Sequence, residues 1–471
     1  MVVGEIAEGV DLLVVGGGPG GYAAAIHGAQ LGREVVLVER DGERGLGGTC
    51  VRVGCIPSKA LIELAESCHR SRSWAARGLE ADNVRVDLQR FQPWKDELVA
   101  GLTRGVDRLL RHHRVRVVRG VATFNKPNRA AVDTEDGKVT FFEFRSAIVA
   151  TGSMPIELRE LPRDGELVLD SSDALSLTEV PRRLVVVGAG YIGVEIGTAF
   201  AKMGSKVTVV EALDRPLPTM EPALGRAVLR SLTALGVEVL ADARVVGRIE
   251  EGVVVRVGGE ERTVLGDRVI VAVGRRPLAR EVGIETTGAR LDERATVVVD
   301  PGRLASKNVA AIGDLTPGPA LAHKATAEAE VAAMSVSGKA ASFDPAAIPA
   351  VVFSDPEIAS VGLTEEEGRA LGLDVRTVQF PLSASGRAAI IGQQTGFARL
   401  VVDASSDAVV GAHLAGPHVS ELAAEVALAV EMAASPEDLA GTIHPHPTIS
   451  EAVHEAALLA VGRPLHMMSG S

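Results

Sequence analysis

The chain has 471 residues, 46% of them hydrophobic and 23% charged, which is the balance of an ordinary globular protein with room for about three domains. This composition excludes a disordered or fibrous chain. Aromatic residues make up only 3% and the formal net charge is −12, so the chain lacks the stacking platforms and clustered cations of a nucleic-acid-binding protein. The basic segment from Arg108 to Arg119 is expected to be a solvated helix end followed by an edge strand.

The N-terminal segment and the cysteine content indicate a soluble protein. No apolar stretch reaches the ~18 residues that a membrane-spanning helix needs. Residues 1–11 carry Glu5 and Glu8 and none of the basic residues of a signal peptide. The three cysteines are odd in number and do not make a secreted disulfide scaffold. We therefore expect a cytoplasmic protein that contacts no membrane.

A strand, a glycine-rich loop and a helix begin the chain. They comprise a predicted strand over 11–15, the glycines Gly16, Gly18 and Gly21, a predicted helix over 22–31 and a strand over 34–38 followed by Glu39. The first glycine permits a tight turn, the second lets the backbone approach a pyrophosphate, and the third lets the helix pack on the strand. The helix N-terminus offers N–H groups to the phosphates, and the acid accepts hydrogen bonds from ribose hydroxyls.

The same pattern returns near the middle of the chain. It comprises a strand over 184–187, the glycines Gly188, Gly190 and Gly193, a helix ending at Met203 and a strand over 206–210 followed by Glu211. In both copies the acid follows the third glycine by 18 positions. One such motif is weak evidence, but two copies with correctly spaced acids strongly predict two dinucleotide-binding domains. A carboxylate at Glu211 repels a 2′-phosphate, which favours NAD over NADP.

An insert distinguishes the first copy from the second. Each copy closes with a strand and a glycine, Gly152 or Gly274, but the first copy is longer by about 50 residues. The extra residues hold two cysteines and two predicted helices, at about 57–72 and 93–112.

Cys50 and Cys55 lie five positions apart at the start of the first inserted helix. A helix N-terminus with Arg52 or Lys59 nearby lowers a thiol pKa, so the pair predicts a redox-active dithiol. A zinc site would need two more ligands. The only local candidates, Cys68 and His69, lie further down the predicted helix, and we predict no metal site. Cys68 is expected to be a small buried helix residue.

The remaining chain predicts a return segment and a last domain. A strand leading to Gly313 and Asp314, followed by a helix over 320–336, is expected to complete the first domain. Strands near residues 351, 375, 398 and 409, then helices from 420 and 436, indicate an α+β domain. The predicted fold is α/β, with two Rossmann-like dinucleotide-binding domains and a C-terminal α+β domain. The predicted boundaries are 1–152 for the first domain with its insert, 153–280 for the second, 281–348 for the return segment and 349–471 for the last domain.

A histidine motif lies near the C-terminus. Residues 444–451 hold His444 and His446, each followed by a proline, and Glu451. A histidine that a carboxylate orients is a typical general base, and a dithiol centre needs one. We therefore predict that His446 and Glu451 form this pair. His444 is expected to be structural, and His323 to contact a cofactor.

These motifs together resemble the pyridine nucleotide–disulfide oxidoreductase family over nearly the whole chain. The resemblance rests on both glycine loops, the segment 47–59 around the two cysteines, the closing segments 150–152 and 273–277, residues 312–314, 355–362, and 446–448 with Glu451. It is strongest to the members that oxidise dihydrolipoyl groups with NAD⁺. The resemblance implies FAD in the first domain, NAD in the second, and a homodimer formed by the last domain.

The resemblance also implies the roles of individual residues. Besides the first glycine loop, positions that match FAD-binding residues are Glu39, Lys59, Gly120, Thr151, Gly152, Ser153, Asp314, Ala320, Leu321, Ala322 and His323. Positions that match NAD-binding residues are Gly188, Gly190, Gly193, Glu195, Glu211, Val245 and Gly274. Lys59 and Glu195 match an ion pair near the flavin.

For catalysis, the resemblance makes Cys50 the thiol that exchanges with lipoamide and Cys55 the thiolate against the flavin. His446 and Glu451 would act on the disulfide of the partner subunit. The implied second partner is a lipoyl-bearing protein, either the acyltransferase of a 2-oxo acid dehydrogenase complex or the carrier of a glycine cleavage complex.

Several features separate this chain from other branches of the family. NADP-dependent members usually carry Ala for the third glycine of the second loop, where this chain has Gly193. Mercury-reducing members end in a cysteine pair that residues 461–471 lack, and soluble transhydrogenases lack one active thiol. Two departures, Arg52 where Asn is frequent and Pro445 where Ala is frequent, flank the thiol-exchange site and bear on substrate choice.

Two alternatives stay open from the sequence. One is an NADH-dependent reductase of another disulfide, and the other is a flavoprotein subunit with a mainly scaffolding role. The presence of Cys50, Cys55, His446 and Glu451 together argues against a scaffold, which needs none of them.

Overall fold

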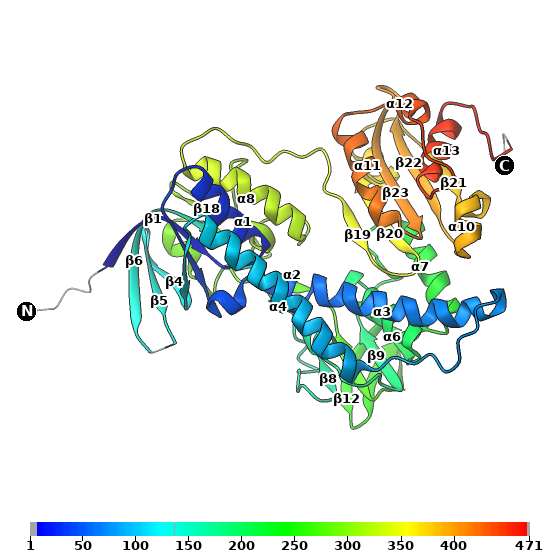
Figure 1. The fold of residues 1–471 in the computed structure, drawn as a ribbon, viewed down its shortest axis with the longest axis horizontal. Coiled ribbons are helices and arrows are strands. Elements are labelled where there is room, and N and C mark those ends of the chain that lie inside the picture. The colour runs from blue at the N-terminus through cyan, green and yellow to red at the C-terminus, as the bar shows by residue number, and fades with distance from the viewer. Residues whose placement is uncertain (1–6, 136, 469–471) are drawn as a thin grey trace, which may run out of the picture. The chain divides into compact units, whose positions relative to one another are not determined.

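The computed structural model describes residues 7–135 and 137–468, and its elements are labelled in Figure 1. The chain forms two compact units. The first unit comprises Met1–Ala60, Asp87–Ile156 and Gly274–Asp344, and the second comprises Leu61–Val86, Glu157–Val273 and Pro345–Ser471. No helix in the described part of the chain is long and apolar enough to cross a membrane.

A largely parallel sheet forms the centre of the first unit. Its main path, in spatial order, is β17 (Leu304–Ser306), β18 (Val309–Ala311), β6 (Val139–Val149), β1 (Ala7–Val15), β2 (Val35–Glu39) and β3 (Arg116–Arg119), with β4 (Val121–Lys126) and β5 (Arg129–Asp133) attached through β6. The C-terminal half of β1 is buried on both faces. Its side chains alternate between two hydrophobic cores. Leu12 and Val14 pack in the core that includes α1 (Pro19–Gln30) and α8 (Ala322–Val336), whereas Leu13 and Val15 pack in the core that includes β4 to β6.

The insert of the first copy is helical, as predicted. It contains α2 (Gly48–Val53), α3 (Cys55–Ser73) and α4 (Leu88–His112). The predicted start of the second inserted helix at residue 93 is wrong, because the Asp87 side chain accepts a hydrogen bond from the Arg90 N–H at 3.1 Å and caps the helix five residues earlier. Pro93 then lies inside the helix. The basic segment before Arg119 is a helix end followed by β3 at the sheet edge, as expected.

A five-stranded parallel sheet forms the nucleotide-type half of the second unit. Its order is β11 (Glu238–Leu240), β10 (Lys206–Val210), β9 (Arg183–Val187), β15 (Arg268–Val271) and β8 (Val168–Leu169). Its helices are α5 (Ser171–Ala174), α6 (Tyr191–Met203) and α7 (Pro222–Ala234), and an antiparallel sheet of β12 (Ala243–Ile249), β13 (Gly252–Val257) and β14 (Glu260–Leu265) lies beside it. In the first unit, β7 (Ser153–Pro155) pairs with β16 (Arg275–Pro277).

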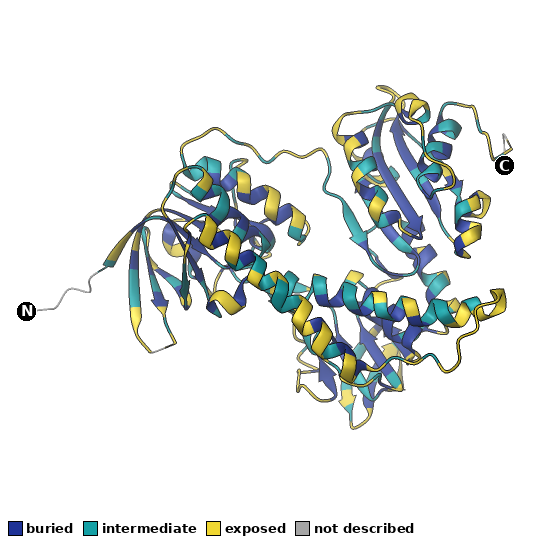
Figure 2. Ribbon diagram, in the orientation of Figure 1, coloured by how far each residue is buried: buried dark blue, intermediate teal, exposed yellow. Residues whose placement is uncertain are grey.

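The C-terminal half of the second unit is an antiparallel sheet with helices. The strand order is β19 (Ala350–Val352), β20 (Glu357–Gly362), β23 (Ala408–Gly416), β22 (Phe397–Asp403) and β21 (Val375–Pro381). The helices are α9 (Glu365–Ala370), α10 (Gly386–Ile391), α11 (Val419–Glu431), α12 (Pro436–Gly441) and α13 (Glu451–Ala460). The central strands β22 and β23 are buried along most of their length (Figure 2). The predicted α/β class with a C-terminal α+β domain is confirmed.

Candidate active site

The first glycine loop connects β1 to α1 through a turn that only glycine fits. Gly16 has φ of +100°, in the left-handed region. A Cβ on Gly21 would overlap the carbonyl oxygen of Gly16, so the third glycine lets α1 approach the end of β1. Gly18, the N-cap of α1, provides no side-chain acceptor for the first-turn N–H groups. These donors suit the pyrophosphate of a dinucleotide.

The second loop repeats this geometry between β9 and α6. Gly188 also has φ of +100°, and a Cβ on Gly193 would overlap the carbonyl oxygen of Gly188. A Cβ on Gly190 would meet no described atom within 4 Å. The middle glycine therefore faces open space at the helix N-terminus, where a pyrophosphate fits without displacing protein atoms.

Each acidic residue holds its own glycine loop in addition to its expected role. The Gly17 N–H donates to Oε2 of Glu39 at 2.6 Å, and the Ala189 N–H donates to Oε2 of Glu211 at 2.6 Å. Burial raises the pKa of Glu39, and the hydrogen bond from Gly17 opposes that shift. Because a carboxylate oxygen has two lone pairs, both acids can still accept a ribose hydroxyl.

The two cysteines are placed by the consecutive helices α2 and α3. Cys50 lies within α2 and is half-buried, and Cys55 is the first residue of α3. Gly54 separates the helices, and a Cβ there would lie 2.8 Å from the carbonyl oxygen of Thr49, so the break requires glycine. The side chains of Cys50 and Cys55 are hydrogen-bonded to each other. The structure therefore brings the two predicted cysteines together.

The pKa of the Cys50 thiol is raised, so the lowering expected for a thiol of this pair is not found at Cys50. The largest cause is its hydrogen bond with Cys55, followed by burial, whereas Lys59 lowers the pKa as expected of a nearby cation. Arg52 pairs with Asp41 at 2.8 Å, which partly neutralises its charge.

A hydrogen-bonded chain joins three segments of the first unit. Ser153 Oγ donates to Oδ2 of Asp314 at 2.5 Å, and Arg275 Nε donates to Ser153 Oγ at 2.8 Å. Arg275 also donates to the Ser153 carbonyl oxygen at 2.6 Å. The sequence analysis predicted Ser153 and Asp314 but missed Arg275. Its only signal was its place in the closing motif over 273–277.

The other predicted FAD positions lie in the same unit. The Gly120 N–H donates to the Glu39 carbonyl oxygen at 3.0 Å, and Thr151 Oγ1 donates to the Leu278 carbonyl oxygen at 3.3 Å. Gly152 has φ of +72°, and a Cβ there would meet nothing within 4 Å. Ala320, Leu321, Ala322 and His323 lie at the start of α8, of which Leu321 is the N-cap. The open space at Gly152 leaves room for a flavin nucleotide, whereas Gly120 and Thr151 hold neighbouring segments of the protein.

The remaining NAD positions are divided between the units. Glu195 is buried in α6 and accepts the Phe353 N–H at 2.9 Å, and Val245 lies in β12. Gly274 and Lys59 belong to the first unit. The ion pair of Lys59 with Glu195 therefore stays a prediction.

His446 and Glu451 form the pair that the motif predicts. His446 Nδ1 lies 2.8 Å from Oε1 of Glu451, whose other oxygen accepts the Thr448 N–H at 2.8 Å. Burial opposes ionisation of Glu451, but the hydrogen bonds from His446 and Thr448 lower its pKa overall. The His446 side chain is 79% exposed, so its second ring nitrogen can reach a substrate.

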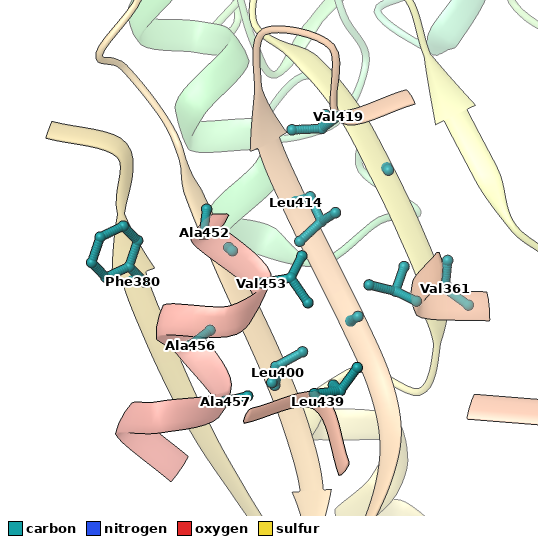
Figure 3. Close-up of a cluster of buried hydrophobic side chains, with 14 of the residues drawn as sticks. Val361, Phe380, Leu400, Leu414, Val419, Leu439, Ala452, Val453, Ala456 and Ala457 are labelled. Atoms are coloured by element: carbon teal, nitrogen blue, oxygen red, sulfur yellow. The ribbon is translucent and has the colours of Figure 1, made fainter. Parts of the chain in front are cut away.

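The packing of α13 fixes the position of Glu451. Glu451 is the first residue of this helix, and Ala452, Val453, Ala456 and Ala457 bury its inner face. In Figure 3 these side chains point toward the strands that carry Leu400 and Leu414. The carboxylate therefore sits on a rigid element, as an orienting group requires.

Two further predictions concern residues outside the reaction. His444 Nε2 contacts Oε1 of Glu425 at 2.7 Å and its ring stacks on His454, in agreement with a structural role. Cys68 is 4% exposed within α3, as expected for a buried helix residue.

Comparison with known proteins gives the class. Residues 10–329 match the model of the pyridine nucleotide-disulphide oxidoreductase family, and residues 348–457 match the dimerisation domain of that family. The chain belongs to the pyridine nucleotide-disulphide oxidoreductase family.

Individual relatives are similar over their full length. The chain is 44% identical over 474 residues to dihydrolipoyl dehydrogenase from Geobacillus stearothermophilus, covering 100% of both chains. It is 46% identical over 461 residues to dihydrolipoyl dehydrogenase from Pseudomonas aeruginosa, covering 97% of this chain and 98% of the relative. Among solved structures, LpdA from Mycobacterium tuberculosis has a TM-score of 0.87 at 28% identity, covering 96% of this chain and 100% of that chain. The HOCl-induced flavoprotein disulfide reductase RclA from Escherichia coli, in its Cu(II) complex, has a TM-score of 0.84 at 26% identity, covering 96% and 99%.

Proposed function

We propose that this protein is a dihydrolipoyl dehydrogenase, which oxidises protein-bound dihydrolipoyl groups with NAD⁺ through FAD and the Cys50–Cys55 pair. The observation that carries the proposal is the full-length identity of 44% and 46% to relatives of that name. The chain combines this similarity with two thiols in hydrogen-bond contact and a paired, exposed histidine.

Both nucleotide sites fit their cofactors. In the first unit, the Gly16–Gly21 loop would hold the FAD pyrophosphate, Glu39 a ribose, and Asp314 with the start of α8 the flavin end. In the second unit, the Gly188–Gly193 loop and Glu211 would hold NAD. When bound, FAD supplies the carrier that takes two electrons from the dithiol and passes them as hydride to NAD⁺.

The dithiol of the substrate exchanges with the Cys50–Cys55 disulfide in two steps. A thiolate of the substrate attacks Sγ of Cys50, the Cys50–Cys55 bond breaks, and Cys55 leaves as a thiolate. The second substrate thiolate then attacks the substrate sulfur bound to Cys50, which closes the lipoyl disulfide and releases Cys50. Cys50 then takes up a proton.

His446 acts as the general base of the exchange. Its Nδ1 faces Glu451, so Nε2 is the nitrogen that takes a proton from the substrate dithiol. Glu451 holds the ring in this orientation and stabilises the imidazolium. The match of residues 348–457 to a dimerisation domain supports a homodimer in which this pair serves the partner's dithiol. The cytoplasmic location expected from the sequence stays a prediction.

Steady-state kinetics test the proposal. The holoenzyme is assayed with dihydrolipoamide or reduced glutathione as donor and NAD⁺ or NADP⁺ as acceptor, and in reverse with lipoamide or glutathione disulfide. We expect turnover with dihydrolipoamide and NAD⁺, and much lower efficiency with NADP⁺ because Glu211 repels a 2′-phosphate. Faster reduction of glutathione disulfide than of lipoamide would contradict the assignment of dihydrolipoyl groups as the substrate. Equal efficiency with NAD⁺ and NADP⁺ would contradict the role of Glu211.

A further inference from the structure

Lys324 and Glu328 form an ion pair in the interior of the first unit that the proposed reaction does not use. Their side chains are 1% and 0% exposed, and Lys324 Nζ lies 3.0 Å from Oε1 of Glu328, one turn along α8. Arg303 Nη1 donates to the same oxygen at 2.9 Å. A buried ion pair is often no more stable than well-packed apolar residues of similar size. Stability alone therefore does not account for this cluster.

The ion pair holds both polar groups of a single residue, Gly313. Oε2 of Glu328 accepts the Gly313 N–H at 2.7 Å, and Lys324 Nζ donates to the Gly313 carbonyl oxygen at 3.1 Å. Lys324 also donates to Thr316 Oγ1 at 2.9 Å, at the end of the same turn. Gly313 has φ of +72°, so the turn has a conformation that the chain does not adopt by default.

This turn carries Asp314. Its carboxylate is held on the other side by Ser153, which Arg275 holds in turn. The backbone of Asp314 is thus fixed by the buried ion pair, and its side chain by Ser153. Neither Lys324 nor Glu328 has exposed surface with which to reach a ligand.

We propose that Lys324 and Glu328 are positioning residues that fix the Asp314 carboxylate for FAD and act through Asp314 alone. This inference deepens the proposed function and depends on FAD binding in the first unit. Glu328→Gln replaces one acceptor oxygen by a donor that faces Lys324, Arg303 or the Gly313 N–H. Lys324→Met keeps a side chain of similar volume but removes the ammonium group that donates to the Gly313 carbonyl oxygen and to Thr316 Oγ1.

The test is titration of the apoprotein with FAD, followed by flavin fluorescence, together with the thermal midpoint of each apoprotein. Loss of a hydrogen bond to a charged group corresponds to about 10- to 100-fold in affinity, and we expect each substitution to weaken FAD binding by that factor. In an Asp314→Ala background the same substitutions should change the FAD Kd by less than about twofold, because Asp314 no longer transmits their effect. Equal losses in both backgrounds would show a general structural role and overturn the inference.

The second unit offers a matched control for a buried lysine. Lys202 is 7% exposed and paired with Glu66 and, at 2.7 Å, with Asp355. Lys202→Met should lower the thermal midpoint and leave the FAD Kd unchanged. If Lys324→Met does not fold, Thr316→Val is the alternative. It removes only the hydroxyl, which accepts from Lys324 Nζ at 2.9 Å and lies 3.0 Å from Oε1 of Glu328, and it should still weaken FAD binding.

The outcomes separate this inference from the proposed function. A wild-type protein that binds no FAD contradicts both. A wild-type protein that binds FAD and oxidises dihydrolipoamide, with variants of unchanged FAD Kd, contradicts only the role of Lys324 and Glu328.

Discussion

The two dinucleotide-binding copies share one loop geometry and differ in what lies against it. In the first copy, the Gly47 N–H donates to the Gly17 carbonyl oxygen at 2.9 Å. A Cβ on Gly48 would lie 2.6 Å from the Cα of Gly18, so the start of the insert packs on the middle of the loop. In the second copy, Leu217 takes the corresponding place, because its N–H donates to the Ala189 carbonyl oxygen at 2.9 Å. Space at the middle glycine is similar in both copies: a Cβ on Gly18 would first meet an atom at 4.0 Å, and a Cβ on Gly190 would meet nothing within 4 Å.

The segments that pack on the two loops differ in chemistry. The insert on the first loop carries both cysteines, on the consecutive helices α2 and α3, so the first copy combines a cofactor site with the redox pair. The segment on the second loop, around Leu217, carries no cysteine and holds only the backbone of its loop.

The largest expected effect comes from removing the thiol that only the first copy possesses. Cys55→Ser leaves no disulfide to accept electrons, so dihydrolipoamide oxidation should fall to background. NADH oxidation by an artificial acceptor should persist, because it needs only the two nucleotide sites. Cys68→Ala, at the buried cysteine of the same helix, is the control and should retain dihydrolipoamide oxidation. Substantial activity of Cys55→Ser would contradict the dithiol mechanism.

His446→Gln should lower dihydrolipoamide oxidation by about 10²- to 10⁴-fold, because a positioned acid–base group contributes that much. It should spare NADH oxidation by the artificial acceptor. The control is His466→Gln. His466 Nδ1 lies 2.6 Å from Oε1 of Glu455, which is on α13 with Glu451, and of the groups that lower the pKa of Glu451 His466 contributes least. Equal losses in the two variants would argue against a specific base at His446.

Mixed dimers test whether His446 serves the partner subunit. His446→Gln and Cys50→Ser subunits are each inactive, but a mixed dimer would contain one intact site if histidine and thiols come from different chains. Random reassociation at equal amounts should then restore about a quarter of wild-type activity. Mixed dimers without activity would show that each site is built within one chain.

Gly190→Ala directly tests the openness of the second loop. The protein leaves room for the new Cβ, so the variant should fold normally, but the methyl group occupies the approach to the pyrophosphate. We expect the KM for NAD⁺ to rise on the order of tenfold, equivalent to about 1.4 kcal/mol, with unchanged FAD content. Gly193→Ala is the contrasting variant. Its Cβ would overlap the Gly188 carbonyl oxygen unless α6 shifts, so this variant should fold with a lowered thermal midpoint, since NADP-dependent members of the family usually carry Ala at this position. An unchanged KM in Gly190→Ala would place the nucleotide elsewhere.

The smallest expected effect is a pH dependence of FAD binding that arises from Glu39, the acidic residue that holds the first glycine loop. Burial raises the pKa of Glu39 above its ordinary value of 4.5, so this carboxylate takes up a proton at higher pH than an exposed glutamate. As the pH falls from 7 to 5 the FAD Kd should therefore rise, since protonated Glu39 accepts ribose hydroxyls less well. Glu39→Gln should show a flatter profile.

The stability of the apoprotein depends on pH in the opposite direction to FAD binding, because it falls as the pH rises. A raised folded-state pKa means that the Glu39 contribution to stability is present at low pH and is lost as the pH rises through the folded-state value. The thermal midpoint of the Glu39→Gln apoprotein should therefore exceed that of wild type most at pH 7 and converge with it toward pH 4.5. A constant difference across this range would contradict the pKa shift.

Much of the site follows from local spacing. The turn at Gly16, the close approach at Gly21 and the acid at Glu39 lie within a strand, a loop and a helix whose geometry is set by neighbours in the chain. The same holds for the two thiols, which the break at Gly54 brings together, and for His446 with Glu451, only five positions apart. Such features are encoded by a few residues at fixed separations, and the sequence predicted them.

The sequence by itself therefore determined the repeat, the fold class, the thiol pair and the histidine pair. Only the tertiary structure decided that the pKa of Cys50 is raised, because this shift depends on the position of the Cys55 side chain and on burial. It also decided the role of Ser153, which meets Asp314 across 161 positions of chain. Lys324 and Glu328 are ordinary helix residues in sequence, and they become a site only where Gly313 packs against them. Contacts between distant segments arise from packing of the whole core, so no local pattern of residues specifies them.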